Sequence, residues 1–384
     1  MTRDSTRSSV GNGVPLAALW GIGLLMLLSQ PARSQIVVES DRARLTVEGF
    51  ANLTLARVST ADDLQSLDDG RIDGGLRVLG QTSLAAGPTL GIRLAVEGSD
   101  DSARLTEASI LLFDGHGRLE IGERTGLPDV LTGYAPNNFQ FTSAEFGPAS
   151  GPSLDPGGGL QTGFFRGLLA EQIGPLAGLG ATAALFDDRS TKVLYVSPKT
   201  HGWLVGASYA RDADDAAVEQ LFQAGVTHES YRQQDTVRWG ATYAHGQASA
   251  AQPSARDLSS VGVGTSVTLH DVWMIGLAAS YDGTSRLPAN AAGSFASRAW
   301  GGTASVNFNS GPWTLGGYYQ YATGEGSTAV AANDRLAAIE VGASFRFTTR
   351  WRVYGAWYRF DFDDDERGAS TAGNVFLLGA RATL

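Results

Sequence analysis

Apolar and polar residues alternate through most of this 384-residue chain, and the alternation limits the folds that it can adopt. In residues 260–269, Val261, Val263, Val267 and Leu269 fall on one side of an extended chain, opposite serine, threonine and glycine. Successive side chains of a β-strand point to opposite faces, so the pattern predicts a strand with one apolar and one polar face. We therefore expect an all-β protein.

Sixteen segments with this pattern, most of them roughly 8–14 residues long, follow one another almost to the C-terminus. Their connections switch between short turns, such as 270–271 and 310–311, and long loops, such as 58–70 and 283–297. One end of the array is thus expected to carry tight turns and the other end large loops, as in transmembrane barrels. A soluble sandwich of two sheets, which also shows the alternation, is the alternative.

Charged residues occupy the polar face of many segments. A packed sandwich core could not hold so many charges without partners, and a charge that faces lipid costs about 2–4 kcal/mol at mid-bilayer. A water-filled interior accommodates them, and sixteen strands is a size at which a barrel leaves an aqueous channel. We therefore expect a transmembrane antiparallel β-barrel of 16 strands. The charged residues are Arg77, Arg93, Glu97, Arg118, Arg124, Arg238, Glu340, Arg346 and Arg381.

Tryptophan placement also favours a barrel in a membrane. Trp203, Trp273, Trp313 and Trp351 each follow a short turn by a residue or two, which would put four rings at one level. Amphipathic aromatic rings favour the boundary between membrane and water. Tryptophans in a sandwich core are the alternative, but core rings would not collect on the turn side.

The longest connection runs over residues 125–189 and is rich in glycine, proline and acidic residues. Such a long connection inside a regular β array is uncommon and usually functional. We expect it to be the third large loop, to fold into the barrel and to set the bore of an aqueous pore. Its segments 163–169 and 179–186 could form an extra hairpin or a short helix, so an eighteen-stranded barrel is a second possibility.

The N-terminus has the three parts of a secretory signal peptide. Arg3 and Arg7 precede an apolar run at 14–28, and Ala32-Arg33-Ser34 fits a small-x-small cleavage site. We expect residues 1–34 to be removed and residues 35–384 to form the barrel; a retained anchor is the alternative. Removing this segment takes three arginines and one aspartate from a chain of net charge −10, which leaves −12.

Composition excludes several classes of site. The chain has no cysteine, so disulfides and thiolate metal sites are excluded. Its acidic balance disfavours nucleic-acid binding. The acidic run at 363–366 lacks the spacing and glycine of a calcium-binding loop. We expect no cofactor and no metal. Acidic outer loops could bind lipopolysaccharide through divalent cations or simply face water.

At three places the chain resembles the general bacterial porin family. Residues 115–122 look like its tight turn into strand five, and Glu145-Phe146-Gly147 is similar to the acidic segment of its constriction loop. Residues 195–198, followed by Gly202-Trp203, resemble the end of strand six and the start of strand seven. The chain departs from the family in ending on Leu384 where the family usually has phenylalanine.

The resemblance implies a homotrimer in the Gram-negative outer membrane, in contact with lipid and lipopolysaccharide. It also implies an infolded acidic loop that faces a basic wall across the narrowest point of the pore, where opposed charges sort ions and orient solutes. The candidate loop acids are Asp129, Glu145 and Asp155, and the candidate wall cations are Arg77, Arg93, Arg124 and Lys192.

The sequence therefore predicts an outer-membrane porin, a passive diffusion channel for small hydrophilic solutes and ions with a weak cation preference. A porin selective for a sugar or an anion is one alternative. A structural or adhesive barrel plugged by its long loop is another. An outer-membrane hydrolase needs a nucleophile close to a histidine, and none of the five histidines lies near a recognisable nucleophile motif. We expect no enzymatic activity.

Overall fold

The computed structural model describes residues 36–60, 67–85, 87–99, 102–124, 126, 127, 131, 190–213, 218–249, 257–281, 297–325, 333–364 and 369–383. Within these ranges no helix is both long and apolar enough to cross a membrane. The strands are β1 (Ile36–Glu39), β2 (Ala43–Thr60), β3 (Leu67–Ser83), β4 (Thr89–Ser99), β5 (Ser102–Asp114), β6 (Gly117–Glu123), β7 (Thr191–Val196), β8 (Trp203–Ala213), β9 (Val218–Arg232), β10 (Asp235–Ala248), β11 (Leu258–Leu269), β12 (Trp273–Tyr281), β13 (Ser297–Ser310), β14 (Trp313–Glu325), β15 (Asn333–Arg346), β16 (Trp351–Asp364) and β17 (Ala369–Thr383).

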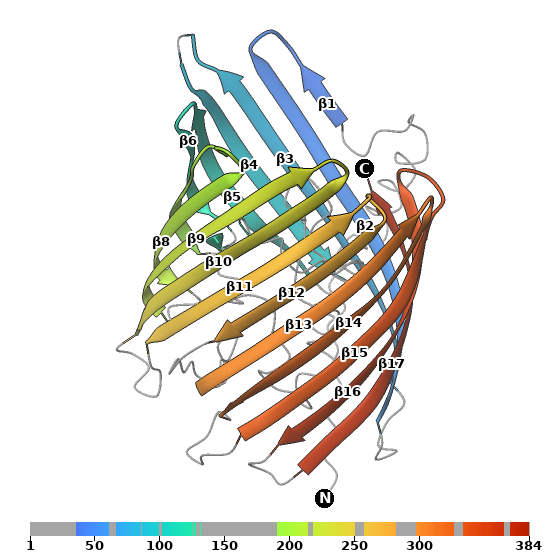
Figure 1. Ribbon diagram of the computed structural model, residues 1–384. Coiled ribbons are helices and arrows are strands. Elements are labelled where there is room, and N and C mark those ends of the chain that lie inside the picture. The colour runs from blue at the N-terminus through green and yellow to red at the C-terminus, as the bar shows by residue number, and fades with distance from the viewer. Residues whose placement is uncertain are drawn as a thin grey trace, which may run out of the picture.

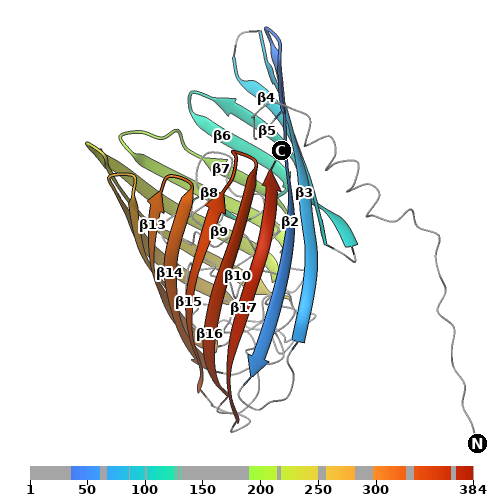
Figure 2. The same ribbon diagram turned by 90° about the vertical axis from the view of Figure 1, so that its right-hand side faces the viewer.

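Strands β2 to β17 form one closed antiparallel ring. Each strand pairs with its neighbours in the sequence, and β17 pairs with β2 from Thr383 opposite Phe50 to Gly373 opposite Thr60. Figures 1 and 2 show the resulting tilted cylinder. The predicted sixteen-stranded barrel is confirmed. Because β6 pairs directly with β7, no further hairpin enters the ring between them. The short β1 pairs with the start of β2, outside the predicted set.

The two ends of the cylinder differ as predicted, although several loops are shorter than expected. Turns at the upper end in Figure 1 are as short as 115–116 and 233–234. At the other end, the loop expected over 58–70 is wrong at its margins, because β2 and β3 stay paired as far as Val58 opposite Leu67. Strands that extend beyond the apolar band do not need to alternate, so the sequence pattern does not mark their ends.

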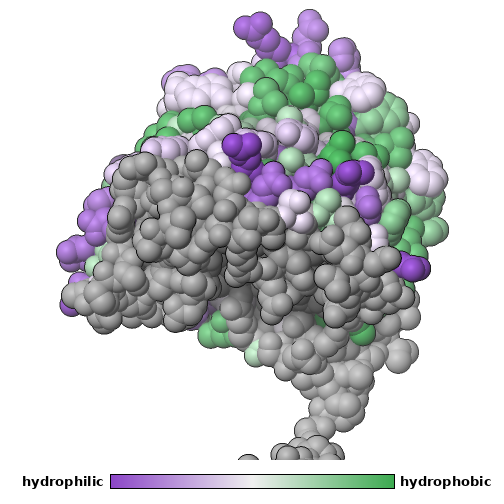
Figure 3. Space-filling view, turned by 90° about the horizontal axis from the view of Figure 1, so that it is seen from below, coloured by the Kyte–Doolittle hydropathy of each residue, from purple (hydrophilic) through white to green (hydrophobic). Residues whose placement is uncertain are grey.

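The apolar faces of the strands point outward. In β12, Trp273, Ile275, Leu277, Ala279 and Tyr281 are exposed, whereas the residues that alternate with them are buried. The same holds in β4, where Ile92 and Leu94 are exposed and Arg93 is buried. Apolar side chains are visible on the outer flank of the barrel in Figure 3. A band of exposed apolar side chains around a closed sheet is the surface that contacts hydrocarbon.

The four tryptophans noted in the sequence begin β8, β12, β14 and β16, each directly after a turn at the upper end in Figure 1. Trp203, Trp273 and Trp313 are 42%, 46% and 50% exposed, which is unusual for so large an apolar ring. Their outward position at one end of the wall suits the boundary between hydrocarbon and water.

Candidate functional site

Three of the predicted wall cations lie together on the inner face of the barrel. Arg77 in β3, Arg93 in β4 and Arg124 directly after β6 meet around two carboxylates, Glu107 in β5 and Glu120 in β6. Neighbouring strands bring these residues together, although up to 47 positions separate them in the chain. We refer to Arg77, Arg93, Arg118, Arg124, Glu48, Glu107 and Glu120 as the wall network.

Glu120 is the centre of one half of the wall network. Arg93 Nη1 donates a hydrogen bond to Glu120 Oε2 at 2.9 Å, and Arg124 Nε donates to the same oxygen at 3.0 Å. Arg118 Nε lies 2.7 Å from the other oxygen, Oε1. The Glu120 side chain is 1% exposed. One buried carboxylate is therefore held by three guanidinium groups.

Glu107 is the centre of the other half. Its Oε2 lies 3.5 Å from Arg77 Nε and 3.9 Å from Arg93 Nε, and its Oε1 accepts a hydrogen bond from Arg124. Arg77 also reaches Glu48 of β2, with 3.7 Å between Nη1 and Oε2. Arg93 and Arg124 thus contact both central carboxylates and link the two halves.

A β-bulge in β5 sets the direction of Glu107. Ala95 of β4 pairs with Glu107, but the next residue, Val96, pairs with Leu105, so Thr106 is an extra residue in β5. The Thr106 hydroxyl donates a hydrogen bond to the Ala95 carbonyl at 3.3 Å. Thr106 and Glu107 are both buried, whereas Leu105 faces outward. The bulge therefore turns Glu107 inward, where strict alternation from Leu105 would point it to lipid.

The wall network carries four guanidinium groups and three carboxylates. Arg77, Arg93, Glu107 and Glu120 are each less than 9% exposed. Charges this deeply buried are tolerated only when they are paired and hydrogen-bonded. The contacts supply that pairing and leave one surplus positive charge, so the network stiffens the wall and makes it weakly basic.

Lys192 of β7 is buried on the inner face and pairs across the strands with Gly122 of β6. It thus lies one strand beyond Glu120. The predicted loop acids Asp129, Glu145 and Asp155 lie outside the described residues, as do the segments 163–169 and 179–186. Their position opposite the wall stays a prediction.

The described start of the long connection lies on the inner wall. Leu127 and Leu131 are 0% and 5% exposed and pack against Leu194 and Val196 of β7. These two β7 residues point inward, because Val193 and Tyr195 occupy the exposed outer face. The connection therefore begins inside the barrel.

Two glycines make room for the leucines. Gly206 of β8 and Gly225 of β9 pair directly across the strands. A Cβ atom added to Gly206 would lie 2.7 Å from Leu127 Cδ1, and one added to Gly225 would lie 2.7 Å from Leu131 Cδ1. Any larger residue would displace the leucines. The glycine pair therefore leaves the space on the inner wall that the start of the connection occupies. We call Leu127, Leu131, Gly206, Gly225 and Gln223 the loop anchor.

Gln223 of β9 adds a polar contact to the loop anchor. Its Oε1 accepts hydrogen bonds from the Leu127 backbone N–H and from the Ser208 hydroxyl, both at 2.9 Å. The Gln223 side chain is fully buried, so these bonds are worth more than they would be in water. Sequence reasoning missed this anchor. The spacing of Leu127 and Leu131, four residues apart, was the signal that could have revealed it.

Sequence reasoning also missed Glu48, Glu107 and Glu120 as site residues. It predicted a wall of cations only, namely Arg77, Arg93, Arg124 and Lys192. Within the described ranges, no group of three or more histidine, aspartate or glutamate side chains is placed to hold a metal ion. The arrangement places charged groups on the inner wall of the barrel, where their field can orient and sort solutes.

Comparison with known proteins gives one family and several solved structures. The chain matches the family described as Gram-negative porin over residues 21–365. No curated protein matches it.

Among solved structures, OmpF of Salmonella typhi in complex with daunomycin superposes with a TM-score of 0.63 at 13% identity, covering 91% of this chain and 100% of that one. The anion-selective porin of Comamonas acidovorans has a TM-score of 0.57 at 14% identity, with 89% and 100% covered. OmpT of Vibrio cholerae has a TM-score of 0.54 at 13% identity, with 91% and 100% covered. At these identities the likeness concerns the fold.

Proposed function

Because this chain belongs to the Gram-negative porins and lies in the outer membrane, we propose that it is a passive diffusion channel for small hydrophilic solutes and ions. The observation that carries the proposal is the wall network. Seven charged side chains point inward from one arc of a closed barrel whose outer face is apolar. Such a wall is stable where water fills the interior beside it.

We further propose that the narrowest point lies between this wall and residues of the long connection 125–189. Arg77, Arg93, Arg124 and Lys192 supply the basic side, and Asp129, Glu145 and Asp155 supply the acidic side. The loop anchor supports an infolded connection, because Leu127 and Leu131 already lie on the inner wall. The remainder of residues 35–384 forms the barrel, and residues 1–34 are an export signal.

Ion preference is the most specific part of the proposal. The weak cation preference predicted from the net charge depends on acids in the long connection and the outer loops. The wall network itself has one more cation than it has carboxylates, which favours anions near it. A reversal potential in a salt gradient compares the two contributions directly, and a preference for anions would overturn the predicted cation preference.

Conductance in planar bilayers tests the channel. We expect steady steps on the order of a nanosiemens, since an open bore of sixteen strands is wide and water-filled. The charge reversal Glu145→Arg should move the reversal potential toward anion preference, and Glu123→Arg on the outer side of β6 serves as the control. A bilayer that stays closed after insertion would support the plugged structural barrel instead. An unchanged potential in Glu145→Arg would remove Glu145 from the constriction.

The assembly and the absence of enzymatic activity are also proposals. A solved form of Vibrio cholerae OmpT is described as a trimer, and we propose that this chain also forms a homotrimer. Light scattering of the detergent-solubilised protein tests this by measuring the mass of the assembly. We also propose contact with lipopolysaccharide at the outer loops, measurable as co-purifying lipid. Hydrolysis of a phospholipid or ester by the purified barrel would contradict the non-enzymatic function.

A further inference from the structure

Aromatic residues are distributed unevenly around the ring. Residues 35–124, which supply β2 to β6, contain no tryptophan and no tyrosine, whereas seven of the eight tryptophans and all eleven tyrosines of the chain lie in residues 125–384. The two phenylalanines between 35 and 124 do not face outward, because Phe50 is 4% exposed and Phe113 alternates with the outward Leu112. Five neighbouring strands therefore have an outer surface without aromatic rings.

On the other strands, exposed aromatic rings stand at both ends of the wall. Trp203, Trp273 and Trp313 lie at the turn end, and Tyr281 and Trp300 lie at the opposite end, beside the longer loops. Rings in these two positions mark the boundaries between hydrocarbon and water on each side of a membrane. Because both girdles stop where β2 to β6 begin, these five strands do not present the same surface as the rest of the wall.

The outer surface of β2 to β6 consists mainly of exposed aliphatic side chains, and we call it the aliphatic arc. Leu53 pairs with Ile72 across β2 and β3, and Ile110 pairs with both Ile92 and Ile121 across β4 to β6. Each of these five side chains is 45–57% exposed. The arc occupies one continuous side of the cylinder, coloured blue to teal in Figures 1 and 2.

A notch interrupts the aliphatic arc at Gly80 of β3. Gly80 pairs with Leu45 of β2 and with Ile92 of β4, which are 41% and 55% exposed. A Cβ atom added to Gly80 would have no atom within 4 Å, so the two protruding side chains flank an open depression. Inside a membrane, small residues at such positions allow another protein surface to approach closely and to pack.

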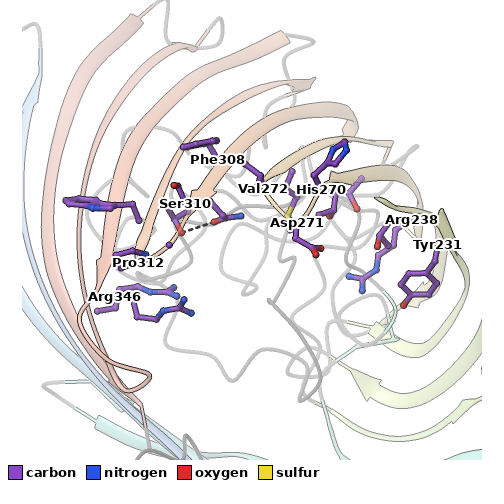
Figure 4. Close-up of a pocket in the computed structure, with 18 of the residues that line it drawn as sticks. Tyr231, Arg238, His270, Asp271, Val272, Phe308, Ser310, Pro312 and Arg346 are labelled. Carbon is purple, nitrogen blue, oxygen red and sulfur yellow. Dashed lines mark hydrogen bonds between the residues drawn. The ribbon is translucent and has the colours of Figure 1, made fainter. Parts of the chain in front are cut away.

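The wall network lies directly behind the aliphatic arc. Its ion pairs link β2 with β3, β3 with β5, β4 with β5, and β4 with β6, so they join the same five strands from the inside. On the far side of the ring, Arg238 and Arg346 instead project from opposite sides into a cavity of about 1030 Å³ (Figure 4). The aliphatic arc is therefore a cross-linked part of the wall, and a stiff surface loses less conformational freedom when it docks.

We propose that the aliphatic arc is the surface through which copies of this chain pack against one another in the membrane. It covers five of the sixteen strands of the ring without interruption, and a cyclic assembly can turn one such patch of every copy toward the shared axis. A neighbouring copy would replace lipid along the arc and shield it from both water boundaries, which explains the missing girdles. The inference rests on the homotrimer proposed above and assigns its interface.

Single cysteines test what covers the arc, because the chain has no cysteine of its own. Leu94→Cys lies in the middle of β4, and Leu277→Cys in the middle of β12 is its matched control; the two leucines are 45% and 53% exposed. A bimane label on each variant is read in vesicles that contain nitroxide-labelled phospholipid. We expect lipid to quench the label at 277 strongly and the label at 94 several-fold less, since a second copy would keep lipid away from β4.

A charge at the same two positions gives an independent readout. Leu94→Arg should reduce the mass of the detergent-solubilised assembly to that of one chain, because a buried charge without a partner opposes packing between copies. Leu277→Arg should leave the assembled mass unchanged, and the shift in gel mobility on heating shows that each variant is folded. An assembly whose mass is unaffected by Leu94→Arg, or whose label at 94 is quenched as strongly as the label at 277, would overturn the interface.

Planar-bilayer recordings separate the interface from the channel. A conducting protein that is a single chain in detergent, with both labels quenched alike, would overturn the interface and the homotrimer and leave the channel standing. A protein that does not conduct, but whose label at 94 is protected, would support the interface and overturn the channel. A label at 94 that is quenched in vesicles of purified protein but protected in isolated outer membranes would show that a different protein covers the arc, which would also overturn the proposal.

Discussion

Single carboxylates hold the inner wall together at the scale of the residue. Glu120 contacts three guanidinium groups, and its side chain has almost no access to solvent. Removing one member of a buried ion pair leaves uncompensated charge, which is more costly than never having placed the pair there. Glu107 and Glu120 therefore matter for folding as well as for the electric field of the bore.

Glu120→Gln is expected to destabilise the barrel. The substitution keeps the side-chain size but removes the negative charge from Arg93, Arg118 and Arg124, at a cost of about 3–5 kcal/mol. Denaturant unfolding in detergent measures the loss. The reversal potential should also move toward anions, because the wall gains one net positive charge.

Glu123→Gln is the matched control for this change. Glu123 lies three residues further along β6, on the outer side, and forms no ion pair with the described residues. Equal stabilities of the two variants would show that the ion pairs around Glu120 contribute nothing to folding.

At the scale of the element, β5 depends on one extra residue. Thr106 is the residue that the pairing with β4 skips. Its deletion leaves Leu105 outward and Glu107 inward in a regular strand, so all contacts of Glu107 can persist. Deleting Ala108 also yields a regular strand, but this strand points Glu107 toward lipid and removes its negative charge from Arg77, Arg93 and Arg124.

The two deletions are therefore expected to behave differently despite equal length. The Thr106 deletion should assemble and show the shift in gel mobility on heating that folded barrels show. The Ala108 deletion should give little folded protein, because Arg77, Arg93 and Arg124 lose the buried carboxylate of Glu107. Assembly of both deletions to the same yield would mean that the direction of Glu107 does not matter.

These elements also show how much of the structure could be predicted from the sequence. Alternation predicted the ring, its apolar outside and the inward direction of Arg77 and Arg93, because each depends only on residues two apart. The partners Glu107 and Glu120 could not be predicted, because pairing between strands and a bulge decide which side chains meet. The loop at 58–70 was overestimated, because strand ends beyond the lipid need no apolar face.

At the scale of the whole molecule, the N-terminal segment is expected to be removed during export. Mature protein purified from outer membranes should begin at Gln35, as sequencing of its N-terminus would show. Ala32→Leu places a bulky residue in the small-x-small site and should block cleavage. A wild-type protein that retains residues 1–34 in the outer membrane would support the retained anchor instead.

Closure of the cylinder has a consequence for biogenesis. The last strand, β17, joins the first strand of the ring, β2, through residues that reach Thr383. Until that seam forms, both borders of the sheet expose backbone N–H and C=O groups that hydrocarbon cannot satisfy. A nascent polypeptide therefore gains little by inserting into the bilayer before β17 is available to pair with β2.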